Sequence, residues 1–410
     1  MRRAVITGLG LVSPIGHDPF RFIRALLEGR SGVGLLSPEL TNGLHGIVGA
    51  QANFDASRHF PTPHAAQLDR GSQMALVAAA QATRDAGLDD ADTQRDRIGV
   101  YWGTGMGGAT TLDDAYYRLY AKGQGAVRPL TIMMAMNHAP AAQISIAHRF
   151  TGPLLTFSSA CASSTHALGE ALRAIRLGVA DAVVAGGSEA LLAPGALCAW
   201  DALRTLAVPD REDPARSCKP FARDRTGLVL GEGAAALVLE ADSLARARGV
   251  HIYAELAGYG ACADSTHLSR PDPAGQARAM RLALEDAGLD PQDVGYINAH
   301  GTATRVGDIA ETEAIKAVFG EHAHRLPVSS TKSMHGHLMG AAGALELIAG
   351  VLSLELHALP PTAHLQEADP ACDLDYVPNV ARRDVSANAV MSNSFAFGGA
   401  NAALVARCYS

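Results

Sequence analysis

The chain has 410 residues, of which 48% are hydrophobic and 18% charged, a composition typical of a folded protein with one large or two medium domains. Its formal net charge of −7 argues against nucleic acid as the main ligand, because a phosphate-binding surface normally needs an excess of basic residues. No apolar stretch approaches the length of a membrane span. The six cysteines are scattered and form no CxxC pair, so we expect reduced thiols in a cytoplasmic protein.

The chain starts with the apolar run Ala4-Val5-Ile6, which Thr7 and Gly8 interrupt, and this pattern predicts a first strand and a turn instead of a secretory leader. Further along, several segments recur in the same order in the two halves of the chain. The matched segments are 7–10 with 257–260, 84–89 with 285–290, 98–102 with 294–297, 103–105 with 299–301, and 231–238 with 398–405. We interpret the preserved order as a degenerate internal duplication.

Each copy alternates predicted strands with predicted helices, a pattern typical of parallel sheets covered by helices. We therefore predict two similar α/β halves that meet near residue 250. Ligands of open α/β sheets bind at the C-terminal ends of the strands. Two halves packed together would thus bring their strand-end loops into one shared cleft.

One cysteine lies where a predicted strand turns into a predicted helix. The apolar run 154–157 precedes the small-residue segment 158–164, which contains Cys161 and leads into helical spacing over 167–175. Backbone N–H groups and the positive end of the helix dipole meet at such a turn, and both favour thiolate over thiol. We therefore expect the pKa of Cys161 to fall below the ordinary value of about 8.5, as a nucleophile requires. The alternative is a small core cysteine without a chemical role.

Two histidines occupy similar positions in the second half. His300 follows a predicted strand in the segment 298–304, and His337 ends the segment 329–337, which also follows a strand. Both turns are rich in small residues, where the backbone can pack close to a substrate. These positions make the two histidines candidate partners of Cys161.

With these pieces in place, the chain resembles the elongating β-ketoacyl-[acyl-carrier-protein] synthases of the thiolase-fold superfamily. The resemblance rests on motifs spread over nearly the whole chain in the family's order: the Cys161 turn, 185–189, 230–233, the His300 motif, 332–346 and 392–399. It implies duplicated α/β halves in a five-layered α-β-α-β-α arrangement. The N-terminal half (1–250) would carry the nucleophile and the C-terminal half (251–410) the two histidines.

The resemblance also implies a role for each catalytic residue. Cys161 would accept an acyl chain from a carrier-protein thioester, and malonyl-carrier protein would then lose carbon dioxide. His300 and His337, as neutral N–H donors, would stabilise the developing enolate oxygen. Lys332 would orient the second histidine, with Glu346 in the surrounding polar network. The product would be a β-ketoacyl chain two carbons longer.

Other residues would bind and admit the substrate. By the same resemblance, the backbone N–H groups of Cys161 and Phe397 would form the oxyanion hole, and Phe397 would also be a gate beside the cysteine. Thr302 and Thr304 would hydrogen-bond the phosphopantetheine arm, unless they only satisfy their local turn. The residues expected at the acyl pocket are Met106, Trp200, Phe395 and, reaching in from a neighbouring subunit, Met134.

The chain departs from the family pattern near the site and at the docking surface. Family members usually carry Gly at position 396, Thr or Ile at 335, Pro at 305 and Phe at 200; here the residues are Ala396, His335, Arg305 and Trp200. The segment 62–82, which helps to dock the acidic carrier protein in relatives, contains a single basic residue. This residue, Arg70, is one docking candidate, and the remaining candidates are Arg128 and Arg204.

These departures leave the pathway open. Our first hypothesis is fatty-acid elongation, and the alternative is a type II polyketide or aryl polyene pathway. We expect either a homodimer or a heterodimer that contains a chain-length partner subunit. We reject a thiolase, which would need a second catalytic cysteine late in the chain. We also reject a dinucleotide-binding dehydrogenase, because the glycines 103, 105 and 108 are not followed by the acidic residue of such a site. We expect no cofactor and no metal, because there is no HExxH motif and His335 and His337 lack a third ligand.

Overall fold

A computed structural model describes residues 2–41, 43–44, 46–89 and 94–410. In this part of the chain the main sheet has ten strands, which fall into two halves of five joined where β1 pairs with β9. From the junction outward, the first half contains β1 (Ala4–Val12), β8 (Gly233–Ala241), β6 (Ala182–Glu189), β4 (Ile98–Gly103) and β5 (Leu154–Phe157). The second half contains β9 (Ala254–Ala263), β15 (Ala400–Arg407), β14 (Ala389–Phe395), β10 (Tyr296–Asn298) and β11 (Val328–Ser329).

The two halves repeat one pattern of strand directions. In each half, the two strands nearest the junction are antiparallel to each other and the second is antiparallel to the third, whereas the outer three are parallel. The prediction of parallel sheets is therefore wrong for the inner strands. Only residues 396–399 separate β14 from β15, and so short a link can join antiparallel strands only. In the first half the longer segment 190–232 makes the equivalent connection.

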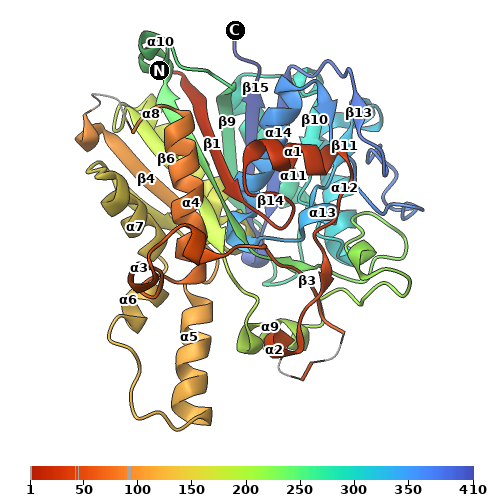
Figure 1. Ribbon diagram of the computed structural model, residues 1–410. Coiled ribbons are helices and arrows are strands. Elements are labelled where there is room, and N and C mark those ends of the chain that lie inside the picture. The colour runs from red at the N-terminus through yellow and green to blue at the C-terminus, as the bar shows by residue number, and fades with distance from the viewer. Residues whose placement is uncertain (1, 42, 45, 90–93) are drawn as a thin grey trace.

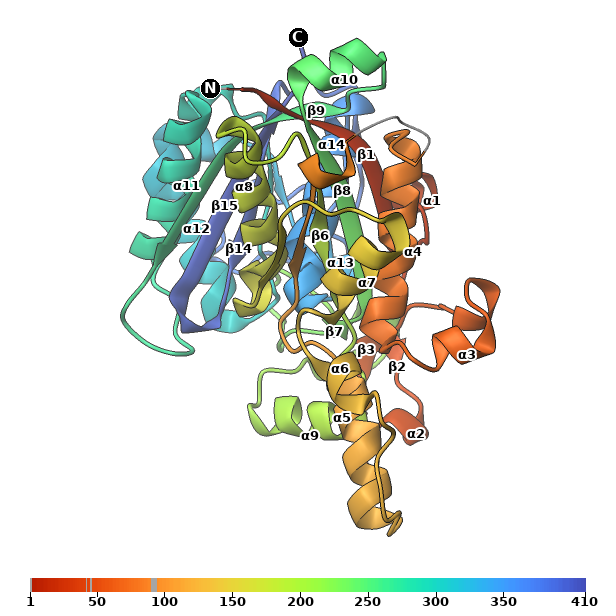
Figure 2. The same cartoon turned by 90° about the vertical axis from the view of Figure 1, so that its left-hand side faces the viewer.

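Helices cover and separate the two half-sheets, as Figures 1 and 2 show. The layer-forming helices are α4 (Arg70–Asp85), α7 (Ala139–His148), α8 (Ser163–Arg176), α11 (Pro273–Ala287), α12 (Arg305–Phe319) and α14 (Ala342–Glu355). Helices α4 and α7 pack on strands of the first half, α11 packs on strands of the second half and α12 packs against α11, while α8 and α14 contact strands of both. The expected five-layered, thiolase-like α-β-α-β-α arrangement is thus confirmed.

The central helix α14 is buried from Ala342 to Leu354, and it is apolar on all sides apart from Glu346 and Ser353. Such a helix needs cover on every face, which the two half-sheets and α8 provide. Within the described ranges, no helix is long and apolar enough to cross a membrane.

Shorter elements surround these layers. The remaining α-helices are α1 (Pro19–Leu27), α2 (Pro38–Thr41), α3 (Thr62–Ala65), α5 (Ala109–Tyr116), α6 (Thr131–Ala135), α9 (Pro194–Ala202), α10 (Asp242–Arg248) and α13 (Lys332–His335). The short strands are β2 (Gly34–Leu35), β3 (Val48–Ala50), β7 (Leu230–Gly231), β12 (Ala358–Leu359) and β13 (Arg382–Arg383). Helix α5 and the π-helical turn after it, η3 (Tyr117–Ala121), project from the body at the end where α9 and α2 also lie (Figures 1 and 2).

Equivalent glycines explain why the repeat is visible in the sequence. A Cβ atom at Gly10 of β1 would lie 2.1 Å from the carbonyl oxygen of Ala78 in α4, and one at Gly260 of β9 would lie 2.1 Å from that of Ala279 in α11. Only glycine allows each helix to pack this closely on its strand.

Gly260→Ala is therefore expected to lower the free energy of unfolding by about 1–3 kcal/mol, because the added methyl group forces α11 away from β9. The urea midpoint of unfolding measures this effect. Gly34→Ala is the matched control, since a Cβ at Gly34 meets no atom of the described residues within 4 Å. Equal midpoints for the two variants would contradict the packing argument.

Candidate active site

The predicted strand-to-helix turn carries Cys161. The residue lies in the short 3-10 turn η4 (Ala160–Ala162), between the end of β5 and the start of α8. Its neighbour Ala160 has φ 49°, a left-handed conformation that is strained for a residue with a side chain. The turn thus holds the thiol at the C-terminal edge of the parallel strands.

The fold brings this thiol to both candidate histidines. His337 Nε2 lies 3.0 Å from Cys161 Sγ, and the rings of His300 and His337 are 5.4 Å apart at an interplanar angle of 84°. All three side chains are buried. They come from the end of β5, the end of β10 and the loop after α13.

Burial reverses the expected charge of the nucleophile. Loss of solvation raises the pKa of Cys161 to about 12, although Lys332 and the backbone N–H groups of Phe397 and Cys161 oppose the rise. The prediction of a lowered pKa is therefore wrong. The helix and backbone dipoles are present, but they do not outweigh the removal of water. The resting nucleophile is a thiol.

This protonation state gives a testable pH profile. The rate at which iodoacetamide alkylates Cys161 is expected to rise about tenfold per pH unit from pH 7 to beyond pH 10, because the thiolate fraction grows until the pH reaches the pKa. Peptide mass spectrometry at Cys161 measures this rate, and an unstructured cysteine peptide, with a pKa of about 8.5, is the control. A plateau near pH 7 would show that the thiol is already ionised.

The two histidines are neutral for a related reason. Burial lowers the pKa values of His300 and His337 well below 6.5, and the positive charge of Lys332 lowers them further. Lys332, at the start of α13, is fully buried and forms an ion pair with Glu346 of α14. Burial raises the pKa of Glu346, and Lys332 opposes this rise. A buried cation next to neutral imidazoles favours negative charge in the space between them.

Sequence reasoning missed a second carboxylate that holds the first histidine. Glu311 of α12 accepts hydrogen bonds from the backbone N–H groups of His300 (2.9 Å) and Gly301 (2.7 Å) and from Asn393 Nδ2 (3.1 Å). A carboxylate on the buried face of α12, one turn after Asp308, is the signal that could have found it. Glu311 fixes the turn that presents His300.

A carboxylate of the first half links both halves at the site. Glu189, at the end of β6, accepts hydrogen bonds from the backbone N–H groups of Gly105 (2.6 Å), Met106 (3.2 Å) and Gly340 (2.9 Å). Gly340 follows His337 in the second half. The motif that contains Glu189 therefore secures the position of one half relative to the other.

A cavity of about 520 Å³ leads to the thiol. The sequence-predicted residues that line it are Cys161, Trp200, Arg204, His300, Thr302, Thr304, His337, Phe395 and Phe397. The ring of Trp200 stacks on that of Phe397, with centroids 6.1 Å apart at 25°. Thr302 and Thr304 share a hydrogen bond of 3.1 Å, and Thr304 also accepts one from the Gly307 N–H at the start of α12. The geometry thus accommodates an arm-binding role for these threonines, and the local-turn role is present as well.

Two expected pocket residues lie elsewhere. Met106 is 47% exposed and does not line this cavity, and its backbone N–H donates to Glu189. Met134 is buried in its own chain and lines a separate cavity of about 240 Å³. Its neighbours Ile132 and Met133 are 60% and 62% exposed. The predicted role of Met134 concerns the acyl pocket of a neighbouring subunit and stays a prediction.

The three docking candidates lie in different environments. Arg70 donates to both carboxylate oxygens of Glu232 at 2.8 Å and 2.6 Å, so it is bound within the fold and is not free to dock a partner. Arg128 is exposed, with Asp114 3.9 Å away. Arg204 lines the cavity mouth.

The catalytic trio has one further chemical property. The donor atoms of Cys161, His300 and His337 all lie within 4.8 Å of one another, so the trio could hold a thiophilic metal ion such as Zn²⁺. Cys161 thus supplies the third ligand that the sequence argument did not foresee for His337. His335 faces the Gly336 carbonyl oxygen and Thr331 instead.

A buried thiol beside two neutral histidines, at the shared end of duplicated α/β halves, defines a condensing enzyme of the thiolase-like class. The family described as "Beta-ketoacyl synthase, N-terminal domain" matches residues 1–245, and "Beta-ketoacyl synthase, C-terminal domain" matches residues 253–366. The chain belongs to the β-ketoacyl synthase family.

Its relatives cover almost the full chain. The 3-oxoacyl-[acyl-carrier-protein] synthase 2 of Staphylococcus aureus (strain N315) is 43% identical over 408 residues, which are 98% of each chain. Nodulation protein E of Rhizobium meliloti (strain 1021) is 44% identical over 404 residues, again 98% of each chain. A solved β-ketoacyl synthase from Burkholderia phymatum STM815 superposes with a TM-score of 0.93 at 37% identity, with 100% of each chain covered.

Two further solved structures come from assemblies. One is described as the ishigamide ketosynthase/chain length factor, with a TM-score of 0.92 and 35% identity over 100% of each chain. The other, AntDE:AntF, is described as a type II PKS acyl-carrier protein in complex with its ketosynthase bound to the hexaketide, with a TM-score of 0.91 and 33% identity over 100% of each chain.

Proposed function

We propose that this chain is a β-ketoacyl-[acyl-carrier-protein] synthase that extends an acyl chain by two carbons in fatty-acid synthesis. The observation that carries the proposal is the position of Cys161 Sγ, 3.0 Å from His337 Nε2 and beside His300, at the inner end of the cavity. The similarity to 3-oxoacyl-[acyl-carrier-protein] synthase 2 supports the same reaction.

The first half-reaction loads the enzyme. The Cys161 sulfur attacks the carbonyl carbon of an acyl-carrier thioester, a new C–S bond forms, and the old C–S bond breaks. The thiol proton leaves with the carrier thiol, so the sum of protons is unchanged. The backbone N–H groups of Cys161 and Phe397 face the sulfur and would stabilise the tetrahedral oxyanion.

The second half-reaction forms the carbon–carbon bond. Malonyl-carrier thioester loses carbon dioxide, and the electron pair of the broken C–C bond becomes an enolate. Neutral His300 and His337 donate N–H bonds to the enolate oxygen, and Lys332 favours its charge. The carbanion then attacks the acyl-cysteine, and Cys161 leaves as a thiolate that takes up a proton.

Neither step requires a metal or redox cofactor, and we propose that the enzyme works without one. Activity should survive treatment with a chelator. Because Cys161, His300 and His337 could hold Zn²⁺, added zinc should inhibit the enzyme. We also propose a cytoplasmic location, consistent with six cysteines that are all free.

We propose acyl carrier protein as the partner and a homodimer as the assembly. Strand β5 is the last strand of the sheet, and its residues Leu154 and Leu155 are 37% and 46% exposed. Ile146, Leu177 and Val179 are also exposed apolar residues. An uncovered apolar edge strand suits pairing with a second copy. Light scattering of the wild type should give twice the mass of one chain, and Leu155→Lys should lower the measured mass toward that of one chain. A wild-type monomer would favour a heterodimer with a chain-length partner instead.

A specialised polyketide or polyene pathway is the second candidate. It is favoured by the Trp200–Phe397 stack, which presents flat aromatic surface on the cavity wall, and by the similarity to a solved ketosynthase that is described as part of a type II PKS. A flat wall suits planar conjugated chains.

Intact-mass spectrometry after incubation with a panel of acyl-carrier thioesters tests both candidates. We expect wild type to gain the mass of saturated medium and long acyl chains, and Cys161→Ala to gain none. Loading with short or conjugated chains alone would move the chain to the specialised pathway. Absence of loading from every thioester would overturn the proposal for the chain acting alone.

A further inference from the structure

Three arginines surround the mouth of the cavity that ends at Cys161. Arg204, Arg270 and Arg305 all line it, and all three are exposed. Within the described ranges, no carboxylate oxygen lies within 4.0 Å of any of their guanidinium nitrogens, whereas Arg70, Arg176 and Arg248 each pair with a carboxylate. In a chain with a net charge of −7, these free positive charges at a single opening suggest an anionic ligand.

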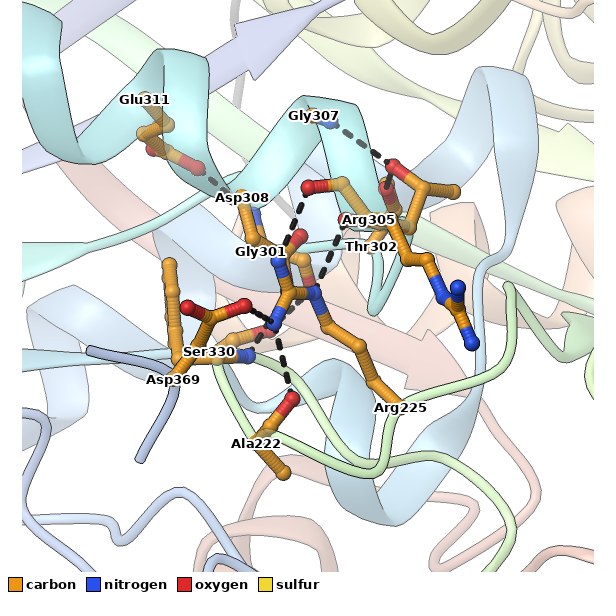
Figure 3. A network of polar contacts seen from close by, with 12 residues as sticks. Ala222, Arg225, Gly301, Thr302, Arg305, Gly307, Asp308, Glu311, Ser330 and Asp369 are labelled. Carbon is orange, nitrogen blue, oxygen red and sulfur yellow. Dashed lines mark hydrogen bonds and ion pairs between the residues drawn. The ribbon is translucent and has the colours of Figure 1, made fainter. Parts of the chain in front are cut away.

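The backbone beneath Arg305 is held rigidly. The buried guanidinium of Arg225 donates hydrogen bonds to the carbonyl oxygens of Thr304 (3.1 Å) and Arg305 (2.8 Å). Two carboxylates balance its charge: Asp369 at 2.7 Å and Asp308 at 3.4 Å. Figure 3 shows the side chain of Arg305 extending away from this network. Arg225 therefore fixes where the Arg305 guanidinium is presented.

The turn that carries Arg270 is also fixed by hydrogen bonds. His267 Nδ1 accepts the backbone N–H groups of Ser269 (3.1 Å) and Arg270 (3.2 Å), which closes the turn that carries Arg270. The same loop contacts the gate, since the Gly398 N–H donates to the Leu268 carbonyl oxygen at 2.6 Å. Arg270 thus lies on a defined turn next to Phe397.

We propose that Arg270 and Arg305 bind the phosphodiester of the phosphopantetheine arm as it enters from the carrier protein. This inference rests on the proposed function. The arm is neutral apart from that phosphodiester, and arginine is suited to phosphate through paired N–H donors. Thr302 and Thr304 directly precede Arg305 in the chain and line the same cavity. Arg270 and Arg305, which we call the phosphate clamp, supply positive charge that Arg70 does not offer, because Arg70 is bound to Glu232.

The test compares three thioester donors: one carries both the carrier protein and the phosphate, one carries the phosphate without the protein, and one carries neither. Initial rates of Cys161 acylation are measured by intact mass with acyl-carrier protein, acyl-phosphopantetheine and acyl-pantetheine, which lacks the phosphate. For Arg305→Ala and Arg270→Ala, kcat/KM for the two phosphate-bearing donors, relative to acyl-pantetheine, should fall at least about tenfold, mainly through KM. Arg305→Lys should recover part of the loss. Arg325→Ala is the control, since Arg325 is exposed and outside the cavity.

The possible outcomes distinguish a failure of phosphate binding by the arginines from a failure of the proposed synthase function. Equal losses for all three donors, or no losses, would overturn the phosphate clamp. A loss with acyl-carrier protein but not with acyl-phosphopantetheine would assign the arginines to the carrier's protein surface and also overturn it. Binding of unacylated phosphopantetheine to Cys161→Ala, measured by calorimetry with and without Arg305→Ala, gives a readout independent of turnover. Weaker binding without Arg305 supports the clamp even if wild type loads no thioester and the synthase proposal itself fails.

Discussion

His300→Ala and His337→Ala should each lower the rate of decarboxylative condensation about 10²–10³-fold, the usual cost of removing one donor from an oxyanion site. Both rings are neutral and buried, and together with Cys161 they enclose the space where the enolate oxygen would form. Loading of Cys161 should fall far less, because the backbone N–H groups of Cys161 and Phe397 serve that step. The double variant should lose less than the product of the two single effects, since both histidines act on one oxygen.

Carbon dioxide release from malonyl-carrier protein measures the condensation step, and intact mass measures loading. His251→Ala, a change at an exposed histidine, is the control. Because burial and Lys332 keep the pKa values of both catalytic histidines well below 6.5, their protonation should not limit the rate between about pH 6 and pH 8. A rate that falls as the pH drops through about 6.5, or equal losses of loading and condensation, would contradict the assigned roles.

Lys332→Met is expected to destabilise the protein by about 3–5 kcal/mol, since it leaves Glu346 as an uncompensated buried carboxylate. Glu346→Leu should lower the stability by a similar amount, because it leaves the buried ammonium group of Lys332 without a partner. The double variant, Lys332→Met with Glu346→Leu, should be more stable than either single variant, because no charge then remains buried without a partner.

Urea unfolding of the four proteins gives the double-mutant cycle. Arg24→Ala, at an exposed ion pair with Glu28, is the control and should leave the midpoint almost unchanged. The double variant should still condense poorly, because the cation that favours the enolate is gone. A double variant with full condensation activity would confine Lys332 to a structural role.

Much of the fold and of the catalytic trio could be predicted, because the decisive signals are local. The strand, turn and helix around Cys161 lie within about twenty residues, and His300 and His337 each follow a strand in a small-residue turn. The repeated glycines of β1 and β9 mark the duplication because each permits the same close helix contact. The antiparallel inner strands were missed because strand direction depends on which ends of the sheet the connections join.

The errors at the site concern what surrounds a side chain in space. Arg70 is a basic residue on a plausible docking helix, but Glu232, 162 positions away, binds it. Met106 and Met134 do not line the cavity that leads to Cys161, and their place at an acyl pocket stays a prediction. No pattern in the sequence reports these distant neighbours.

The sequence by itself determined which residues can carry the chemistry: a cysteine at a strand-to-helix turn, two histidines at strand ends, and a repeat that places all three at one edge. Tertiary structure alone decided their protonation. The turn at Cys161 has the dipoles that lower a thiol pKa, but close packing removes water and raises it instead. A pKa depends on the balance of solvation and charge from all directions, and that balance exists only after distant segments have packed together.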